Sequence, residues 1–295
     1  MLVLNKEEKI VAMKKWLSDM EIFSYRINSD LTVDVMGDVD LSRRKIESFP
    51  LQFNHIKGNF NCEENRLFTL KGAPEKVDGD FDCSNNQLKS LKHSPQFVGG
   101  DYHCTENFLK NLKGAPNKIL NGSFNCSQNY LQTLKGAPVE IFDSFLFAEN
   151  RIKNLKYFPL KTGRHIVGNG NFLTSLKGLN ENARGVLAFS YNRLEKLGVN
   201  LNYCVSFKVN HNFLKNFEGF PKNIENAFFI NQNEISFDEL KNLDTTVVGE
   251  VKSDFGDDED FWQSVKFAKC EGEKQIIEEN LTSENDDVLL QKRRL

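Results

Sequence analysis

The sequence lacks the long apolar run of a membrane helix, because no stretch approaches the ~18–20 apolar residues that span a bilayer. Its N-terminus does not resemble a signal peptide either, since a short apolar run is followed at once by dense charge. Six cysteines would indicate disulfides in a small secreted domain, but a chain of 295 residues without an export signal is not of that kind. We therefore expect a protein of the reducing cytoplasm with no membrane contact.

Catalytic and cofactor motifs are also missing from the chain. There is no G-x-S-x-G, no H-E-x-x-H, no Walker loop and no G-x-G-x-x-G that opens a helix. The five histidines are dispersed along the sequence. We expect no enzymatic activity, no cofactor and no metal site.

Neither sign of charge dominates, since 38 basic and 41 acidic residues leave a net charge of −3. That balance excludes binding of nucleic acid through overall positive charge, so any charged partner must be recognised by a local patch. Aromatic usage is uneven, with 25 Phe against 6 Tyr and 2 Trp. Because Phe has no polar group, this bias predicts a core that uses Phe repeatedly.

An internal repeat of about 21 residues runs through most of the chain. Residues 60–67 and 81–88 are clear copies with the pattern F-x-C-x-x-N-x-L. The repeat is marked by a column of asparagines: Asn65, Asn86, Asn107, Asn129, Asn150, Asn171, Asn192, Asn212 and Asn233. Six prolines each follow a column Asn by nine residues: Pro74, Pro95, Pro116, Pro138, Pro159 and Pro221. The spacing predicts about ten coils over residues 37–240.

Each coil alternates inward and outward residues in a way that predicts one short strand. In F-x-C, Phe81 and Cys83 point to the same side, as alternate residues of a strand do. The column Asn then turns the chain, and Leu88 and Leu91 point back inward. One coil cannot bury its apolar edge alone, so neighbouring coils must stack, with parallel strands ~4.8 Å apart.

The pattern F-x-C-x-x-N-x-L resembles the L-x-L-x-x-N-x-L core of leucine-rich repeats. Residues 65–77 also follow the short bacterial type, in which L-x-x-L follows Asn and Pro stands at the ninth place. Two features depart from that type: the usual length of 21 residues, one longer than expected, and the Lys-Gly-Ala-Pro corner. This variant looks like the repeat proteins of large tailed bacteriophages and some bacteria. The resemblance covers about two thirds of the chain and implies a solenoid with a parallel β-sheet face and a mostly irregular convex side.

The two ends of the chain are expected to cap the solenoid. Residues 5–20 have the apolar spacing of an amphipathic helix, and residues 22–28 and 31–36 are typical of two strands around a turn. Residues 237–243 and 261–267 favour short helices, followed by a charged tail that is either a solvated helix or disordered. We predict three parts: an N-terminal α/β cap over 1–36, the solenoid over 37–240, and a helical cap with the tail over 241–295.

The cysteine column is interpreted as a buried stack. Its members, Cys62, Cys83, Cys104 and Cys126, occur once per coil and form a line, whereas metal sites need ligands that converge on one point. Later coils place Phe147, Gly168, Phe189, Val209 and Ile230 in the same column, as a core position would. The asparagine column is likewise interpreted as structural, satisfying the turns.

The outward positions of the strands are the usual ligand face of leucine-rich repeats. The residues proposed to bind protein there are Asp40, Asn61, Asp80, Asp82, Asp101, His103, Asn125, Leu146, Val167 and Phe229. They change from acidic to apolar along the chain, and an apolar patch with a polar rim often marks a protein interface. Two alternatives stay open: the acidic half only keeps the protein soluble, or the C-terminal segment covers the apolar half. The acidic row lacks a calcium loop of the EF-hand kind.

A row of lysines on the far corner is a possible phosphate-binding site. Its members are Lys71, Lys92, Lys113, Lys135, Lys156 and Lys177, each six residues after a column Asn. Lys89, Lys110 and Lys153 add a second partial row. A line of lysines matches a phosphate backbone, but this row lacks the interleaved aromatic residues of single-strand binders. The alternative is a solvated corner without a ligand.

Together these patterns predict a non-enzymatic interaction protein. We expect its strand face to bind a host or viral protein, with a blocking, tethering or anti-defence role in a phage-infected bacterial cytoplasm. Nucleic-acid binding through the lysine row is the second hypothesis, and a virion or adhesion component is the third. The identity of the partner and the oligomeric state are left open.

Overall fold

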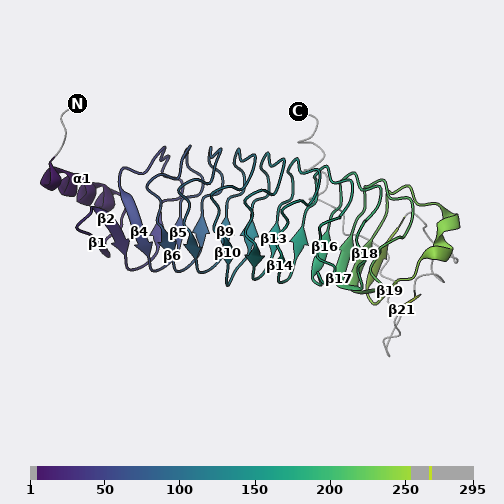
Figure 1. The fold of residues 1–295 in the computed structure, drawn as a ribbon. Helices are drawn as coiled ribbons and strands as arrows, with labels where there is room; N and C mark the ends of the chain where they lie inside the picture. The colour runs from purple at the N-terminus through teal and green to yellow at the C-terminus, as the bar shows by residue number, and fades with distance from the viewer. Residues whose placement is uncertain (1–4, 254–265, 268–295) are drawn as a thin grey trace.

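The computed structural model of the chain describes residues 5–253 and 266–267. These residues form an elongated stack of coils, with α1 (Lys6–Asp19) at one end and the 3-10 helix η1 (Phe237–Asn242) near the other (Figure 1). The stack confirms the predicted repeat solenoid of about ten coils at a spacing of about 21 residues.

One side of the stack is a 13-stranded sheet, called here the long sheet. Phe60 pairs with Phe81, and Phe81 with Tyr102, so equivalent positions of successive coils lie side by side in parallel register. Its strands in order are β3 (Val39–Asp40), β5 (Phe60–Asn61), β7 (Phe81–Asp82), β9 (Tyr102–His103), β11 (Phe124–Asn125), β13 (Phe145–Leu146), β15 (Ile166–Val167), β16 (Val186–Ala188), β17 (Tyr203–Lys208), β18 (Asn223–Phe229), β19 (Thr246–Val247) and β21 (Lys266–Phe267), with β20 (Glu250–Lys252) also paired to β18.

A second ladder of short parallel strands precedes the long sheet in six coils. It comprises β4 (Gln52–Ile56), β6 (Lys76–Val77), β8 (Phe97–Val98), β10 (Lys118–Ile119), β12 (Glu140–Ile141) and β14 (Lys161–Thr162), and the pairing is interrupted between β8 and β10. Three residues, such as 78–80, separate the two ladders. In β17 and β18 one strand runs through both positions, with an irregularity between Cys204 and Ser206. The part of the coil outside the long sheet is therefore more regular than the mostly irregular side that the sequence predicted.

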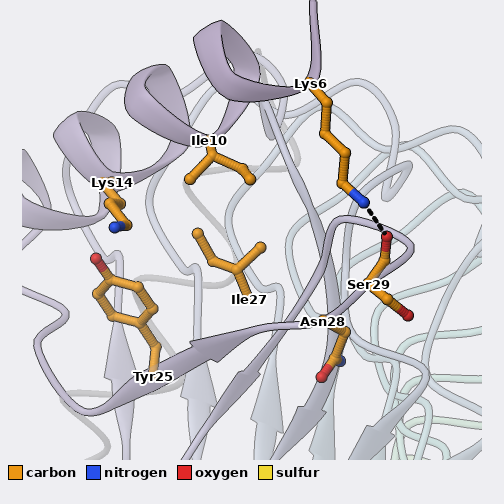
Figure 2. A pocket seen from close by; sticks show the side chains of 7 residues that line it. All are labelled: Lys6, Ile10, Lys14, Tyr25, Ile27, Asn28 and Ser29. Carbon is orange, nitrogen blue, oxygen red and sulfur yellow. Dashed lines mark hydrogen bonds between the residues drawn. The ribbon is translucent and has the colours of Figure 1, made fainter.

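The N-terminal end is closed by α1 and a hairpin, as the sequence predicted. Asn5 and Glu8 form a capping box at the start of α1. Strands β1 (Tyr25–Ile27) and β2 (Thr32–Val35) pair antiparallel, and β2 continues into the coils by pairing parallel with β4. Figure 2 shows Ile10 and Ile27 facing each other across an open groove between α1 and β1.

At the C-terminal end, η1 confirms the short helix predicted over 237–243. The long sheet continues past residue 240 into β19 and β20, and strands on both sides of residue 36 are paired as well. The domain boundaries at 36 and 240 stay predictions. The helix expected over 261–267 lies outside the described residues except for 266–267, which form β21 rather than a helix.

The core is a set of columns, one residue per coil. The largest column holds Phe60, Phe81, Tyr102, Phe124 and Phe145, all fully buried, and successive rings lie 5.0–6.1 Å apart. The four cysteines of the ladder are also fully buried, and burial raises the pKa of their thiols well above the usual range. Buried, protonated thiols in a line match the predicted structural stack.

The column asparagines are buried, except for the half-buried Asn233, and all are bonded at every polar atom of the side chain. Asn86 Nδ2 donates to Cys62 O (2.9 Å) in the preceding coil and to Cys83 O and Ser84 O in its own. Its Oδ1 accepts from Leu67 N at 2.9 Å. Each Asn therefore joins two coils and satisfies the turn, which supports the structural interpretation of this column.

One core position carries a matched pair of polar groups. Tyr102 takes the place of Phe, and Ser94 in the same coil takes the place of Ala; their hydroxyls lie 2.6 Å apart and are buried. In the next coil the same two positions are Phe124 and Ala115, with no hydroxyl to pair. The two polar groups therefore satisfy each other in a place that is otherwise apolar.

We expect Tyr102→Phe and Ser94→Ala each to lower the free energy of unfolding by about 1–3 kcal/mol, because each leaves one buried hydroxyl unpaired. The double variant restores the Phe and Ala of the next coil and is expected to lie near the wild-type stability. Urea unfolding of all four proteins measures the coupling between the two side chains. Additive losses in the double variant would show that the hydroxyls do not depend on each other.

Candidate binding surfaces

Eleven strands of the long sheet each contribute one residue to a single row along the stack, in which neighbouring members pair in register. We call it the strand-face row: Asp40, Asn61, Asp82, His103, Asn125, Leu146, Val167, Ala188, Lys208, Phe229 and Lys252. Parallel pairing places successive members ~4.8 Å apart. The sequence-predicted residues of this row are therefore brought together, whereas Asp80 and Asp101 stand just before their strands.

Four polar members of the strand-face row accept hydrogen bonds from the backbone. Asp40 Oδ1 accepts from Ser42 N (2.9 Å), and this bond lowers the pKa of the Asp40 carboxyl. Asp82 Oδ1 accepts from Ser84 N at 2.8 Å. Asn61 and Asn125 make the equivalent bonds to Glu63 N and Ser127 N. These side chains close a turn at the end of each strand and are held in one orientation by it.

Asp80 and Asp101 belong to a different column with its own structural role. Asp80 Oδ1 accepts from Asp101 N (2.7 Å), and Asp101 Oδ1 accepts from Ser123 N (2.6 Å), so each carboxylate binds the backbone of the next coil. Asp38 and Asn59 make the same contact earlier in the stack. Charge reversal at these residues would remove a bond between coils, so it does not probe ligand binding alone.

The second half of the strand-face row is apolar and then basic. Leu146 and Val167 are half-buried, and Ala188 is buried. Phe229 lies between two lysines, with Lys208 Nζ and Lys252 Nζ each 4.8 Å from its ring centre. Such contacts hold the ring in place through its negative face. The row therefore runs from acidic and amide groups through an apolar centre to a basic, aromatic end.

The lysine row lies on another side of the coil, and all six of its side chains are exposed. The turn beneath each is fixed by a side-chain bond two residues earlier: Thr69 Oγ1 accepts from Lys71 N (3.2 Å), and Ser90 Oγ accepts from Lys92 N (3.1 Å). Among the described residues, no carboxylate lies within 4.0 Å of any of the six ammonium groups. By contrast, Lys76, Lys118 and Lys161 on the second ladder are paired with Asp78 or Glu140.

An aromatic and arginine column runs beside the lysine row, at the position directly after each of the first eight column Asn. Its members are Arg66, Gln87, Phe108, Tyr130, Arg151, Phe172, Arg193 and Phe213. The rings of Phe108 and Tyr130 are stacked at 5.8 Å, and Arg151 Cζ lies 4.5 Å from the Tyr130 ring centre. The lysine row itself contains no aromatic residue, so its pattern in the sequence did not predict these neighbouring aromatics. In the sequence, this column can be found because each of its members stands one residue after a column Asn.

Two kinds of site are not found in the part of the chain that the structure describes. No group of three or more His, Cys, Asp or Glu side chains there is arranged to hold a metal ion. Within the same residues, no helix has the length and apolar character required to traverse a bilayer.

No protein-family model and no curated protein sequence matches the chain. Among solved structures, YopM from Yersinia enterocolitica WA-314 matches with 16% sequence identity and a TM-score of 0.38. The match covers 73% of this chain and 64% of that chain, so this chain spans less than two thirds of the length of YopM. The parallel register between successive coils, and not this match, shows the repeat fold of the chain.

Proposed function

We propose that the protein is a non-enzymatic scaffold that binds a protein partner along the strand-face row. The observation that supports this is the ordered change in chemistry along that row, from Asp40 through Leu146 and Val167 to Phe229. A partner that matches all three zones binds in only one direction and one register. Given the resemblance to phage repeat proteins, the partner is a host or viral protein that is blocked or tethered in an infected bacterium.

The apolar centre and the aromatic end favour a protein as the occupant. Leu146 and Val167 are half-buried apolar side chains that a partner can fully remove from water. Phe229, held between two lysines, is a preordered aromatic anchor of the kind that dominates protein interfaces. The carboxylates of Asp40 and Asp82 at the other end disfavour a polyanion on this face.

The row is also rigid before any partner binds. The turn-closing bonds of Asp40, Asn61, Asp82 and Asn125 fix these side chains. Side chains that are already ordered lose less conformational entropy on association, which favours affinity. The row therefore combines directional chemistry with preorganisation.

The test is an affinity pull-down from infected and uninfected bacterial lysates, read by mass spectrometry, with wild type and the double variant Leu146→Lys/Val167→Lys. Both side chains point outward and neither has a polar bonding role, so the variant is expected to keep the wild-type melting temperature. It is expected to lose the proteins that wild type retains, because two charges would be buried unpaired in the interface.

The matched control is Leu120→Lys/Phe142→Lys, since these two exposed apolar residues lie off the strand-face row. It adds the same charge and is expected to retain the partner. Equal recovery of the partner with both double variants would show that the strand face is not the binding surface. Loss with both would show that added positive charge, rather than position, prevents binding.

A further inference from the structure

The segment from each column Asn to the following Pro forms one side of its coil. Within it, the second and fifth residues after Asn are buried leucines in the coil of Asn65, namely Leu67 and Leu70. The first, third and sixth residues point outward. Over the six coils that begin at Asn65, these eighteen outward positions carry eleven positive charges and no negative charge.

We call these eighteen positions the basic–aromatic face. Its cationic members are Arg66, Lys71, Lys89, Lys92, Lys110, Lys113, Lys135, Arg151, Lys153, Lys156 and Lys177. Its aromatic members are Phe68, Phe108, Tyr130 and Phe172. The molecule has more acidic than basic residues overall, so the absence of acids from this face marks it as a separate electrostatic surface.

Acidic residues define the limits of the basic–aromatic face. Glu47 holds the equivalent outward position in the first coil, and Glu195 and Glu218 appear in the coils that follow the sixth. Along the edge at the Asn corner stand Glu64, which is bonded to Arg43, and Glu149, which accepts from Gln128. A flexible anion on this face would therefore be confined to a strip about five coil spacings long, or ~24 Å.

Three of the four aromatic side chains of this face are exposed in spite of their size, and Phe172 is half-buried. Phe68 is 61% exposed, Phe108 43% and Tyr130 38%. Their backbone is fixed, because Phe108 N and Tyr130 N donate to carbonyl oxygens of the preceding coil. Rigid rings that remain in contact with water can stack with a planar ligand at little cost in ordering.

Planar cations stand next to these rings. Arg151 continues the stack of Phe108 and Tyr130, and Arg193 Cζ lies 4.5 Å from the Phe172 ring centre just beyond the sixth coil. A strip that combines unpaired lysines with exposed rings and guanidinium planes has the two elements of single-strand recognition. Lysines follow the phosphates, and flat groups stack with the bases.

We propose that the basic–aromatic face binds single-stranded nucleic acid. Unpaired bases offer flat faces to Phe68 and Phe108, whereas a duplex hides those faces inside its own stack. An acidic peptide would satisfy the lysines but leaves the rings without a stacking partner. The strip length of ~24 Å suits the lower end of the site sizes of single-strand binders, about 4–16 nucleotides.

The experiment measures fluorescence anisotropy of a labelled oligothymidylate of about 15 nucleotides, titrated with the full chain at about 50 mM salt and above. We expect binding that weakens as salt rises, and weaker binding of a duplex of equal length and of polyglutamate. Lys92→Gln/Lys113→Gln/Lys135→Gln is expected to weaken binding about tenfold or more. It should also reduce the slope of log affinity against log salt by about 2.

The matched control is Lys76→Gln/Lys118→Gln/Lys161→Gln, which removes the same charge from the second ladder. It is expected to leave the affinity within about twofold and the salt slope unchanged, since these lysines lie outside the proposed path. Phe68→Ala, at the most exposed ring of this face, tests stacking and is expected to weaken binding about fivefold or more without a change in slope.

Three outcomes would overturn the proposal. One is no binding of the oligothymidylate at low salt. Another is equal weakening by the two lysine triples, which would mean that total charge and not this face attracts the strand. The third is equal affinity for duplex or polyglutamate together with an unchanged affinity of Phe68→Ala, which would exclude base stacking. None of these outcomes bears on the strand-face row, which lies on a different side of the coil.

Discussion

Asn129→Ala is expected to lower the free energy of unfolding by about 2–5 kcal/mol, the largest effect of any single substitution considered for this protein. Asn129 is buried, and its Nδ2 donates to Cys104 O, Cys126 O and Ser127 O at 2.9–3.3 Å. Its Oδ1 accepts from Leu109 N at 3.0 Å. Alanine leaves the buried Leu109 N–H without a partner, which costs about 1–3 kcal/mol, and removes three further hydrogen bonds that each contribute about 0.5–1.5 kcal/mol.

Urea unfolding followed by circular dichroism measures this loss. The control is Asn117→Ala, because Asn117 is exposed and its side chain makes no hydrogen bond to the residues that the structure describes. We expect the control to stay within about 0.5 kcal/mol of wild type. If Asn129→Ala were no more harmful than Asn117→Ala, the column Asn residues would not hold the coils together.

Gly168→Cys is expected to lower the free energy of unfolding by about 1–3 kcal/mol, although it restores the residue that four earlier coils have at this position. A Cβ at Gly168 would lie 2.5 Å from Phe147 Cε2 and Cζ, and 3.2 Å from Phe189 Cδ1. The Phe147 ring has little room to move, because Phe145 and Phe158 pack against it with ring centres at 4.8 and 6.2 Å. The glycine thus makes room for two large neighbours in the column.

The double variant Phe147→Cys/Gly168→Cys tests this explanation. Removing the Phe147 ring creates the space that the new side chain needs, and the pair then repeats the cysteine stack of the first coils. We expect the double variant to be more stable than the sum of the two single losses predicts, by at least about 0.5 kcal/mol. Simple additivity in urea unfolding would mean that Phe147 is not the neighbour that excludes a side chain at Gly168.

The fold was predictable because its strongest determinants repeat in the sequence. Asn65 and its equivalents, Cys62 and its equivalents, and the paired leucines mark the same place in every coil. Stacking in register follows from that regularity alone. The second ladder of strands was not predicted, because two residues such as Lys76 and Val77 are too short a segment to show an alternating pattern.

The candidate surfaces were less predictable, because their roles depend on contacts between coils. The sequence shows that Asp80 and Asp101 are polar and outward, but only the register shows that each carboxylate binds the backbone of the next coil. The residue before each column Asn has a positive φ, as in Glu106 (50°) and Gln128 (54°), yet only Gly170 among these residues is a glycine. Glycine is usually preferred where φ is positive, but here the Asn bonds and the stacking of the coils hold the turn with other residues. The sequence therefore does not mark these turns by glycine.

The equivalence of bonds from coil to coil has a consequence for how such a chain can change in evolution. Phe81 N donates to Asp101 O and Phe60 N to Asp80 O, so each coil donates to the next coil and accepts from the preceding one through equivalent atoms. Duplication or loss of one whole coil therefore preserves every junction and alters only the number of coils. Each added coil would lengthen the strand-face row and the basic–aromatic face by one step of ~4.8 Å. The number of binding positions for a long partner can thus change in whole coils, while the backbone bonds between coils stay equivalent.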